Sequence, residues 1–200
     1  VTPYYYATYE GGSAPTGIDH VPGIDDFTKQ RIVVVGSGPI RIGQGIEFDY
    51  GCVHAVGAIR ELGHEAIIIN NNPETVSTDF DTSDRLYFEP LTLEHSAEVL
   101  LREKAHGILL QFGGQTAINL ALPLAGRLPH LEGMGLNLAM QGTTPDAVDE
   151  ASDRERFEAF AERVGLRMPN GTTASTSEGV REAVLEIGYP VLIRPSYVLG

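Results

Sequence analysis

The sequence predicts an α/β fold built on a doubly wound parallel sheet. Short apolar runs recur through the first 142 residues, helical patterns separate them, and unusual polar stretches come directly after several of the runs. Strands that helices cover on both faces show continuous apolar runs instead of an alternation. Alternating strands and helices favour parallel pairing through right-handed crossovers.

The central stretch of the chain is residues 31–50. Arg31–Val35 is predicted to be a buried strand, and the glycines of Gly36–Pro39 permit a sharp turn after it. A helix is predicted from about Gly45, because apolar residues recur there on one stripe: Ile46, Val53, Val56, Ile59 and Leu62. A strand, a glycine-rich turn and a helix often hold an anion or a polar ligand at the helix N-terminus.

Two known nucleotide-binding motifs do not fit this turn. The dinucleotide pattern G-x-G-x-x-G requires a glycine where the sequence has Arg41, and an acidic residue where it has Asn70. The phosphate-binding pattern G-x-x-x-x-G-K-[ST] fits Gly38 to Gly43, but Gln44 stands in place of the lysine. Neither motif therefore identifies the ligand of this turn.

Further strands and helices are predicted up to residue 142. The predicted strands are Glu65–Asn70, Arg85–Phe88 and Gly107–Gln111, and the predicted helices are Leu93–Lys104 and Gly113–Ala125. Leu136–Met140 is a candidate fifth strand, preceded by an insertion that contains His130.

Polar stretches at the strand ends are expected to meet in one site. IRIGQGIE, NNNPET and FGGQT each follow the carboxyl end of a predicted strand, and ligands of open parallel sheets lie at that edge. The charged candidates are Arg41, Glu47 and Glu74; alternatively, Arg41 pairs with Glu47 only to fix the loop. Asn72 is expected to shape its turn, and Gln44, Gln111 and Gln115 are expected to satisfy loop amides.

After residue 143 the pattern changes to helices with recognisable caps. In order, the predicted features are a cap at Thr144 with Pro145 opening a helix, a capping box at Ser152–Glu155, a helix end at Gly165, a second box at Ser175–Glu178, a helix end at Gly188, and a strand at Val191–Arg194. Residues 1–30 are rich in glycine, proline and serine after a tyrosine cluster, and are predicted to be a linker; alternatively, they form a tail whose tyrosines pack on the domain.

Charge and composition exclude several classes of protein. The net charge is −13, and only Lys29 and Lys104 are lysine among the 14 basic residues, which argues against nonspecific binding to nucleic acid or membranes. The same balance suggests a halophilic source as a hypothesis. The lone Cys52 is predicted to pack in the core, and the six histidines lack metal-ligand spacing. Neither a secretion signal nor a membrane-spanning run is present, so a cytoplasmic location is expected.

Five stretches together resemble one family. GSGPIRIGQGIEFDYGCVHA, NNPETVSTDFDTSDRLYFEP, QFGGQTAINLA, TPDAVDEASDRERF and GYPVLIRPSYVLG follow one another between residues 36 and 200. They resemble a synthetase half of the carbamoyl-phosphate synthase large subunit, and IGQGIEFDY and NPETVSTDFDTSD are more similar to its C-terminal half. The stretch 127–142 departs from the family pattern.

The resemblance implies a domain plan and roles for individual residues. It implies a Rossmann-like pre-ATP-grasp domain at 31–142 and the truncated start of an ATP-grasp domain at 143–200. Arg154 and Arg194 match arginines that contact nucleotide phosphates, and guanidinium groups bind phosphate bidentately. Alternatively, Arg154 is a surface charge paired within its own helical turn. Residues matching Arg41, Glu47 and Glu74 line the family's interior passage for carbamate.

The resemblance also implies an activity for the whole protein. The family makes carbamoyl phosphate from bicarbonate, ammonia (from glutamine) and two ATP, for arginine and pyrimidine biosynthesis, and this half would phosphorylate carbamate. The implied cofactors are ATP and Mg²⁺ or Mn²⁺, with K⁺ as a further candidate, and the metal ligands would lie beyond residue 200. The implied partners are the rest of the large subunit and a glutaminase small subunit. The 200 residues alone are expected to be inactive. Two alternatives stay open: another ATP-grasp ligase, or a non-catalytic ligand-binding module.

Overall fold

The structure, a computed structural model, describes residues 28–40, 44–169 and 171–193. The chain forms two compact units, residues 1–149 and 150–200, and each is described by itself. Most of the predicted linker lies outside the described residues, as do Arg41 and Arg194. The domain boundaries predicted at 30–31 and 142–143 stay predictions.

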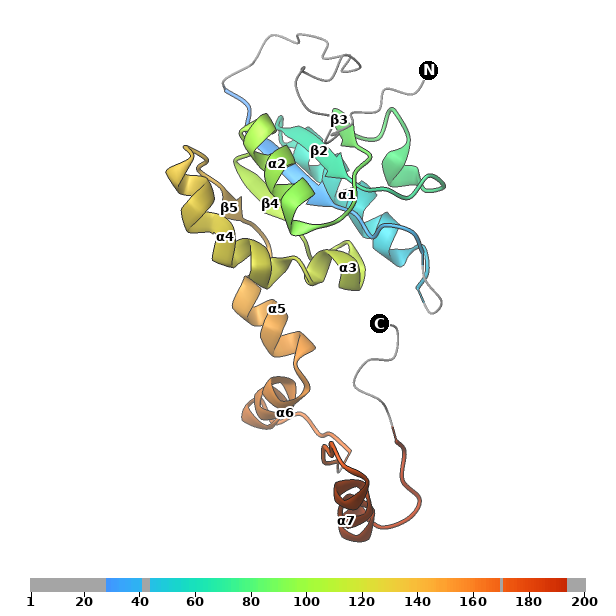
Figure 1. The fold of residues 1–200 in the computed structure, drawn as a ribbon. Helices are drawn as coiled ribbons and strands as arrows, with labels where there is room; N and C mark the ends of the chain where they lie inside the picture. The colour runs from blue at the N-terminus through green and yellow to red at the C-terminus, as the bar shows by residue number, and fades with distance from the viewer. Residues whose placement is uncertain (1–27, 41–43, 170, 194–200) are drawn as a thin grey trace. The chain divides into compact units, whose positions relative to one another are not determined.

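The first unit contains a five-stranded sheet in which all neighbouring strands are parallel (Figure 1). The strand order is β3-β2-β1-β4-β5. The central strand β1 pairs with β2 on one side and with β4 on the other, so Val33 lies opposite both Ile67 and Ile108. The strands are β1 Arg31–Val35, β2 Glu65–Ile69, β3 Arg85–Tyr87, β4 Gly107–Leu109 and β5 Ala139–Met140. The predicted parallel α/β class is confirmed.

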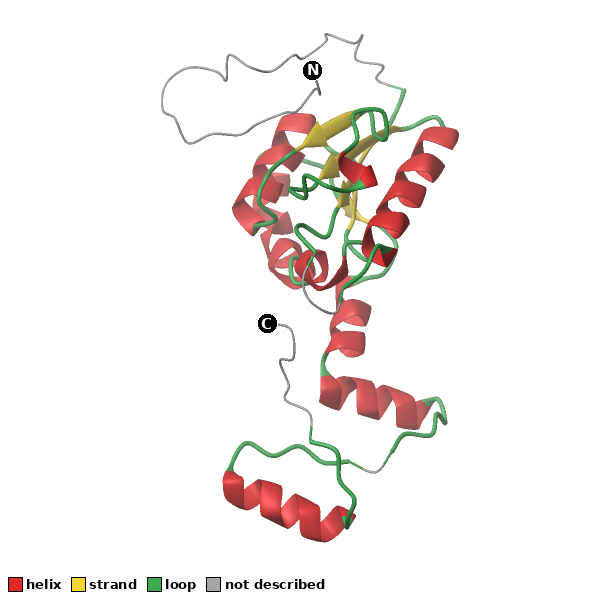
Figure 2. Cartoon of the chain, turned by 90° about the vertical axis from the view of Figure 1, so that its right-hand side faces the viewer, coloured by secondary structure: helices red, strands yellow, loops and turns green. Residues whose placement is uncertain are grey.

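Helices cover both faces of this sheet (Figure 2). Helix α1 (Glu47–Glu61) contributes Val56 to a buried cluster with Val34 on one face. Helices α2 (Leu93–Glu103) and α4 (Ala121–Gly133) contribute to the cluster around Val33 on the other face. Burying one large apolar side chain stabilises a protein by roughly 1.5–3 kcal/mol. Because both faces of β1 are buried, its residues are apolar without alternation, and the sheet is doubly wound.

The segment after β4 differs from the prediction. A single helix was expected over 113–125, but there are two helices, α3 (Gly114–Ile118) and α4, and α4 continues to Gly133. The expected insertion around His130 is therefore helical, although Pro129 lies inside the helix. Leu124 and Leu131 are almost fully buried, and their burial offsets the roughly 3 kcal/mol that an internal proline costs. Of the expected strand 136–140, only Ala139 and Met140 pair.

Of the three later helices, one begins at the predicted cap and two are capped one residue further on. Helix α5 (Pro145–Ser152) begins after Thr144, whose Oγ1 accepts a hydrogen bond from the Ala147 amide at 3.3 Å, as predicted. Ser152 ends α5, so Asp153 caps α6 (Arg154–Arg163) in its place. Thr176, not Ser175, caps α7 (Ser177–Ile187). A cap residue needs an extended backbone, which Asp153 and Thr176 both have.

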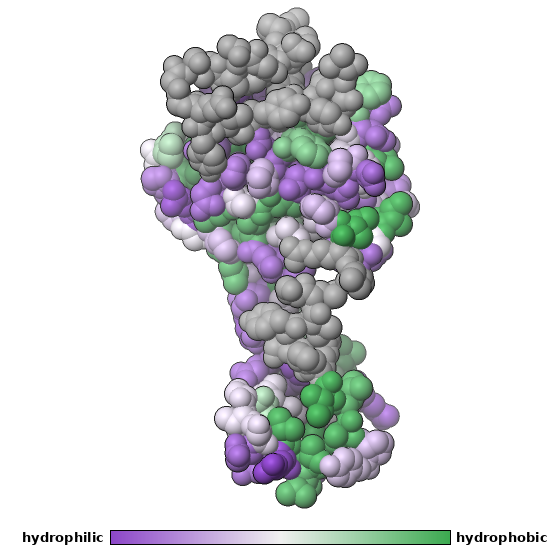
Figure 3. All heavy atoms as spheres, turned by 45° about the vertical axis from the view of Figure 1, so that its right-hand side comes forward, coloured by the Kyte–Doolittle hydropathy of each residue, from purple (hydrophilic) through white to green (hydrophobic). Residues whose placement is uncertain are grey.

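The second unit buries little of its apolar surface. The strand expected at Val191–Arg194 does not form within 191–193, because none of the described residues pairs with it. Ala161 is the one buried residue among those described in this unit. Leu185, Tyr189 and Leu192 are 84%, 86% and 94% exposed, and Figure 3 shows apolar surface gathered on this unit. Within the described part of the chain, no helix combines the length and apolar character that a membrane crossing requires.

Candidate functional site

The carboxyl edge of the sheet carries the predicted site. The described parts of the loops after β1, β2 and β4 are residues 36–40 with 44–46, 70–75, and 110–113. Strand β1 lies between β2 and β4. The chain therefore passes from β1 to β2 in one direction along the sheet, and later returns past β1 to β4 in the other direction. Ligands of open α/β sheets bind at such a switch point, outside the carboxyl ends of the strands.

Asn70 connects two of these loops. It follows β2 directly, is 0% exposed, and donates its backbone N–H to the Tyr87 carbonyl oxygen at 3.0 Å. Its Oδ1 accepts hydrogen bonds from the amides of Gly38 at 3.0 Å and Asn72 at 3.3 Å. Its Nδ2 donates to Ser77 Oγ at 2.9 Å. One buried amide thus joins the loop after β1 to the segment after β2.

Asp49 extends this network into helix α1. It lies in the first turn of the helix, is 4% exposed, and accepts the Ser77 amide at 3.3 and 3.2 Å with its two carboxylate oxygens. Burial, and secondarily the charge of Asp49, raises the pKa of the Cys52 thiol to about 12. Cys52 is fully buried and donates to the Val35 carbonyl at 3.7 Å, which confirms its predicted packing role.

Glu47 and Glu74 are both exposed, on the segments that follow β1 and β2. Glu47 opens α1, and its Oε1 accepts the Gly45 amide at 3.1 Å. Glu74 donates its own amide to Asn72 Oδ1 at 2.9 Å, so Asn72 shapes the turn around Pro73 as predicted. The structure therefore places both carboxylates at the same edge of neighbouring strands. Arg41 lies outside the described residues, so both its place in the site and the alternative, in which it pairs with Glu47 only to fix the loop, stay predictions.

Chain segments pack closely at the carboxyl ends of β1, β2 and β4. A Cβ on Gly113 would lie 2.4 Å from the Val35 carbonyl oxygen and 2.5 Å from that of Gly36. A Cβ on Gly36 would lie 2.4 Å from Asn70 Cγ. Only glycine fits at either position, so the loops that bear the polar residues are packed directly on the strand ends.

Of the glutamines expected to satisfy loop amides, Gln115 is observed with a different partner. Gln115 donates to Asn119 Oδ1 at 2.7 Å, so it binds a side chain four residues on and not a loop amide. The helical spacing of the two residues explains the difference. Gln111 lies against Gly142, where an added Cβ would be 2.0 Å from its Nε2.

Arg154 opens helix α6 and is paired within that helix. Its Nε lies 3.0 Å from Glu158 Oε1, and the two side chains are 55% and 35% exposed. The predicted structural alternative named Asp153 or Glu155, whereas the observed partner is Glu158, one helical turn on. Exposed pairs of this kind contribute about 0.3–0.5 kcal/mol, so the guanidinium could readily bind another anion. Its role toward phosphate stays a prediction, and Arg194 lies outside the described residues.

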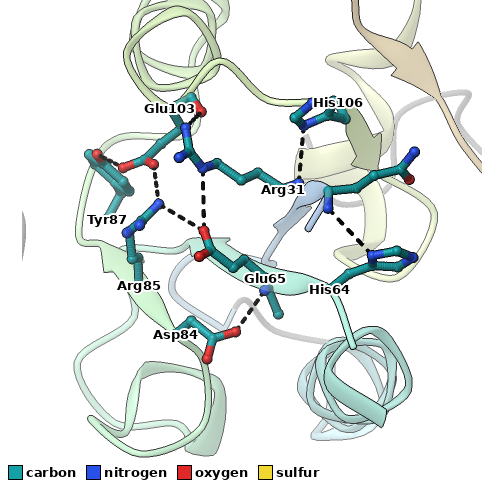
Figure 4. A network of polar contacts seen from close by, with 10 residues as sticks. Arg31, His64, Glu65, Asp84, Arg85, Tyr87, Glu103 and His106 are labelled. Carbon is teal, nitrogen blue, oxygen red and sulfur yellow. Dashed lines mark hydrogen bonds and ion pairs between the residues drawn. The ribbon is translucent and has the colours of Figure 1, made fainter. Parts of the chain in front are cut away.

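A second polar network lies at the opposite, amino edge of the sheet (Figure 4). Arg85 Nη1 binds Glu103 Oε2 at 2.6 Å and Glu65 Oε2 at 3.3 Å, and Arg31 Nε binds Glu65 at 3.3 Å. Tyr87 donates its hydroxyl to the Glu103 carboxylate. Burial and then the Glu103 charge raise the Tyr87 pKa above its usual range. This network ties β1, β2, β3 and α2 together, and we assign it a structural role.

The sequence patterns did not indicate that Asn70, Asp49 and Ser77 form one hydrogen-bond network. Asn70 alone carried a signal, because an uncharged polar residue directly after a buried strand lies at the ligand edge of a parallel sheet. Among the described residues, no group of three or more His, Cys, Asp or Glu side chains could hold a metal ion.

The fold is shared with solved structures of low sequence identity. The biotin carboxylase domain of Hydrogenobacter thermophilus 2-oxoglutarate carboxylase matches with a TM-score of 0.58 and 18% identity, over 80% of this chain and 33% of that one. N5-carboxyaminoimidazole ribonucleotide synthetase from Thermus thermophilus matches with a TM-score of 0.56 and 19% identity, over 80% of this chain and 37% of that one. These similarities establish the fold class alone.

Sequence similarity defines the family. Residues 28–150 match the carbamoyl phosphate synthase preATP-grasp domain, and residues 153–200 match the carbamoyl-phosphate synthase L chain ATP binding domain. The chain belongs to the carbamoyl phosphate synthase large chain family. The large chains of Methanothrix thermoacetophila and Myxococcus xanthus are 52% and 54% identical to it, over 100% of this chain and 17% of each relative. The chain thus spans about a sixth of the length of these relatives.

Proposed function

We propose that the chain is part of a carbamoyl phosphate synthase large chain, an ATP-dependent carbon–nitrogen ligase. The whole protein would make carbamoyl phosphate from bicarbonate, ammonia and two ATP. The observation that carries this proposal is the identity of 52% over 199 residues and 54% over 200 residues to two large chains. The two family models, matched in order along the chain, support it.

Within the whole protein, this stretch would belong to the second synthetase half, which phosphorylates carbamate. Glu47 and Glu74 would line the passage that delivers carbamate, together with Arg41. Their exposure at the carboxyl edge of neighbouring strands supports this assignment, because ligands of parallel sheets lie there. A passage for a labile anion needs alternating charge and hydrogen-bond partners without a tight binding well, and Glu47 and Glu74 would alternate there with the positive charge of Arg41.

Arg154 and Arg194 would contact the phosphates of ATP. The partly exposed, weakly paired guanidinium of Arg154 supports its assignment. The divalent ion, Mg²⁺ or Mn²⁺, and any K⁺ would be held by residues of the whole protein outside this stretch, and would supply charge neutralisation at the transferred phosphoryl group. We place the protein in the cytoplasm, working with a glutaminase small subunit.

The test is an assay of the full-length protein for ATP-dependent conversion of labelled bicarbonate and ammonia into carbamoyl phosphate. Arg154→Ala should raise the KM for ATP about tenfold, which corresponds to losing one charge-assisted hydrogen bond. Arg163→Ala is a matched control, because Arg163 is also exposed, at 63%, and pairs with Glu150 at 2.9 Å. Equal KM values for the two variants would overturn the role of Arg154, and absence of carbamoyl phosphate would overturn the proposed activity.

A further inference from the structure

We infer that Asn70 is a positioning residue that sets where Glu47 and Glu74 lie at the carboxyl edge of the sheet. The inference rests on the proposed function, because it concerns the two carboxylates assigned to the carbamate passage. Asn70 itself is 0% exposed, so its side chain does not face solvent. It would act through the segments that its side chain holds.

Both polar atoms of the Asn70 side-chain amide form hydrogen bonds. Oδ1 accepts from the Gly38 and Asn72 amides, while Nδ2 donates to Ser77 Oγ. A carboxamide can accept and donate at the same time, whereas an ionised carboxylate only accepts. Aspartate has nearly the same shape but cannot donate to Ser77 Oγ: the serine hydroxyl would have to turn and become the donor, and a second carboxylate would contact Ser77 beside that of Asp49. Asparagine therefore suits the site by its hydrogen-bonding pattern as well as by its size, because it donates to Ser77 Oγ without adding a buried charge.

Two branches lead from Asn70 to the two carboxylates. In the first, Asn72 receives the Glu74 amide on its side chain, and its carbonyl oxygen accepts from Thr78 Oγ1 at 2.8 Å. In the second, Ser77 donates its amide to Asp49, which lies two residues after Glu47 in the first turn of α1. Asn72 in the first branch, and Ser77 and Asp49 in the second, are buried. The backbone segments that carry the exposed carboxylates are therefore held in place.

Gly36 indicates that the Asn70 side chain has one fixed position. A Cβ on Gly36 would lie 2.4, 2.6 and 2.7 Å from Asn70 Cγ, Nδ2 and Cβ. The strand end and the amide are packed in contact, so the amide cannot turn away without opening the loop after β1. Displacement of the amide would therefore move both branches together.

The test compares variants of the full-length protein by the number of ATP molecules hydrolysed per carbamoyl phosphate formed. Misplaced passage carboxylates should let carbamate escape after its ATP has been spent, so Asn70→Asp should raise this ratio about twofold or more. Ser77→Ala, a milder change that removes only the acceptor of Nδ2, should raise the ratio in the same direction. Deuterium uptake by the Gly38 and Ser77 amides should also increase in Asn70→Asp.

Glu103→Gln is the matched control, because it weakens a buried network at the amino edge of the same sheet. Glu103→Gln should lower the melting temperature. In an assay at a temperature where all variants remain folded, it should leave the number of ATP molecules hydrolysed per carbamoyl phosphate unchanged. Glu47→Gln and Glu74→Gln should each raise the ratio, and adding Asn70→Asp to the pair should raise it no further, since Asn70 acts through them.

The outcomes separate the inference from the proposed function. If Glu47→Gln and Glu74→Gln raise the ratio but Asn70→Asp and Ser77→Ala behave like Glu103→Gln, Asn70 has only a structural role and the inference fails. If none of these variants changes the ratio, the proposed passage fails as well. A raised ratio in Asn70→Asp that persists undiminished in the Glu47→Gln, Glu74→Gln background would also contradict the inference.

Discussion

Gly113 lies so close to Val35 that a Cβ on the glycine would be 2.4 Å from the valine carbonyl oxygen. This contact lies at the carboxyl ends of β1 and β4, the edge that carries the candidate site. A backbone oxygen at a strand end cannot move aside without disturbing the ladder between β1 and β2, in which Gly36 also donates to the Ile69 carbonyl at 2.8 Å. The contact leads to a first prediction.

Gly113→Ala should lower the free energy of unfolding by about 1–3 kcal/mol, the usual cost of overpacking. Urea denaturation followed by circular dichroism would measure it. Gly126→Ala is the control, because Gly126 lies inside α4 with no atom within 4 Å of an added Cβ. That change should stabilise the protein by up to about 1 kcal/mol through helix propensity. Equal effects of the two changes would show that the close approach is absent.

Tyr87 should make stability fall in alkaline solution. Its pKa is raised in the folded state by burial and by the Glu103 charge, so the folded state keeps the proton at a pH where the unfolded state has lost it. The stabilisation is complete below the ordinary tyrosine pKa, near 10, and is lost as the pH rises above it toward the folded-state pKa.

Denaturation at pH 8, 9, 10 and 11 would reveal this dependence. Tyr87→Phe should flatten the alkaline part of the curve, at the cost of the hydrogen bond to Glu103. Tyr50→Phe serves as the control, because Tyr50 is 64% exposed and should leave the slope unchanged. A slope that is the same in Tyr87→Phe and in the unmodified protein would contradict the assignment.

Cys52 should resist thiol reagents in the folded protein. It is the one cysteine in the chain, its side chain is buried, and its pKa is raised to about 12 by burial and then by Asp49. The thiolate is the reactive form, so at pH 8 modification by a chromogenic disulfide should require unfolding and should become stoichiometric in denaturant. Rapid modification of the native chain would show that the core around α1 opens readily.

Residues 150–200 should not fold cooperatively as a separate polypeptide. Among the described residues of this unit, only Ala161 is buried, so little apolar surface is removed from water. That gain cannot offset the roughly 1–2 kcal/mol per residue lost in ordering the backbone. A thermal scan by circular dichroism should show a gradual change, whereas residues 28–149 should unfold in a sigmoidal transition. A sharp transition in the shorter peptide would refute this prediction.

Local patterns predicted the elements that depend on their own residues. The run Arg31–Val35 forms a strand with those bounds, and Thr144 caps the helix that begins at Pro145. The helix caps at Asp153 and Thr176 were misassigned by one residue. Two neighbouring polar residues could each serve as a cap, and only the backbone conformation selects between them.

The sequence predicted where the candidate site lies on the sheet, but not the hydrogen-bond network that holds it. Glu47 and Glu74 were located at the carboxyl edge because they follow two strands of a parallel sheet. The network beneath them was not predictable, since Asn70 and Gly38 are 32 residues apart, and Ser77 and Asp49 are 28 apart. Such pairings depend on how β1 and β2 lie side by side.

The sequence by itself determined the alternation of strands and helices, the family, and which loops bear the charged residues, because hydrophobic periodicity and motif order are properties of the chain read in one dimension. Only the tertiary structure decided that Asn70, Asp49 and Ser77 form one buried network, and that α4 continues through Pro129. Each of these features balances a local cost against burial or hydrogen bonding by distant residues, and that balance exists only once the sheet has formed.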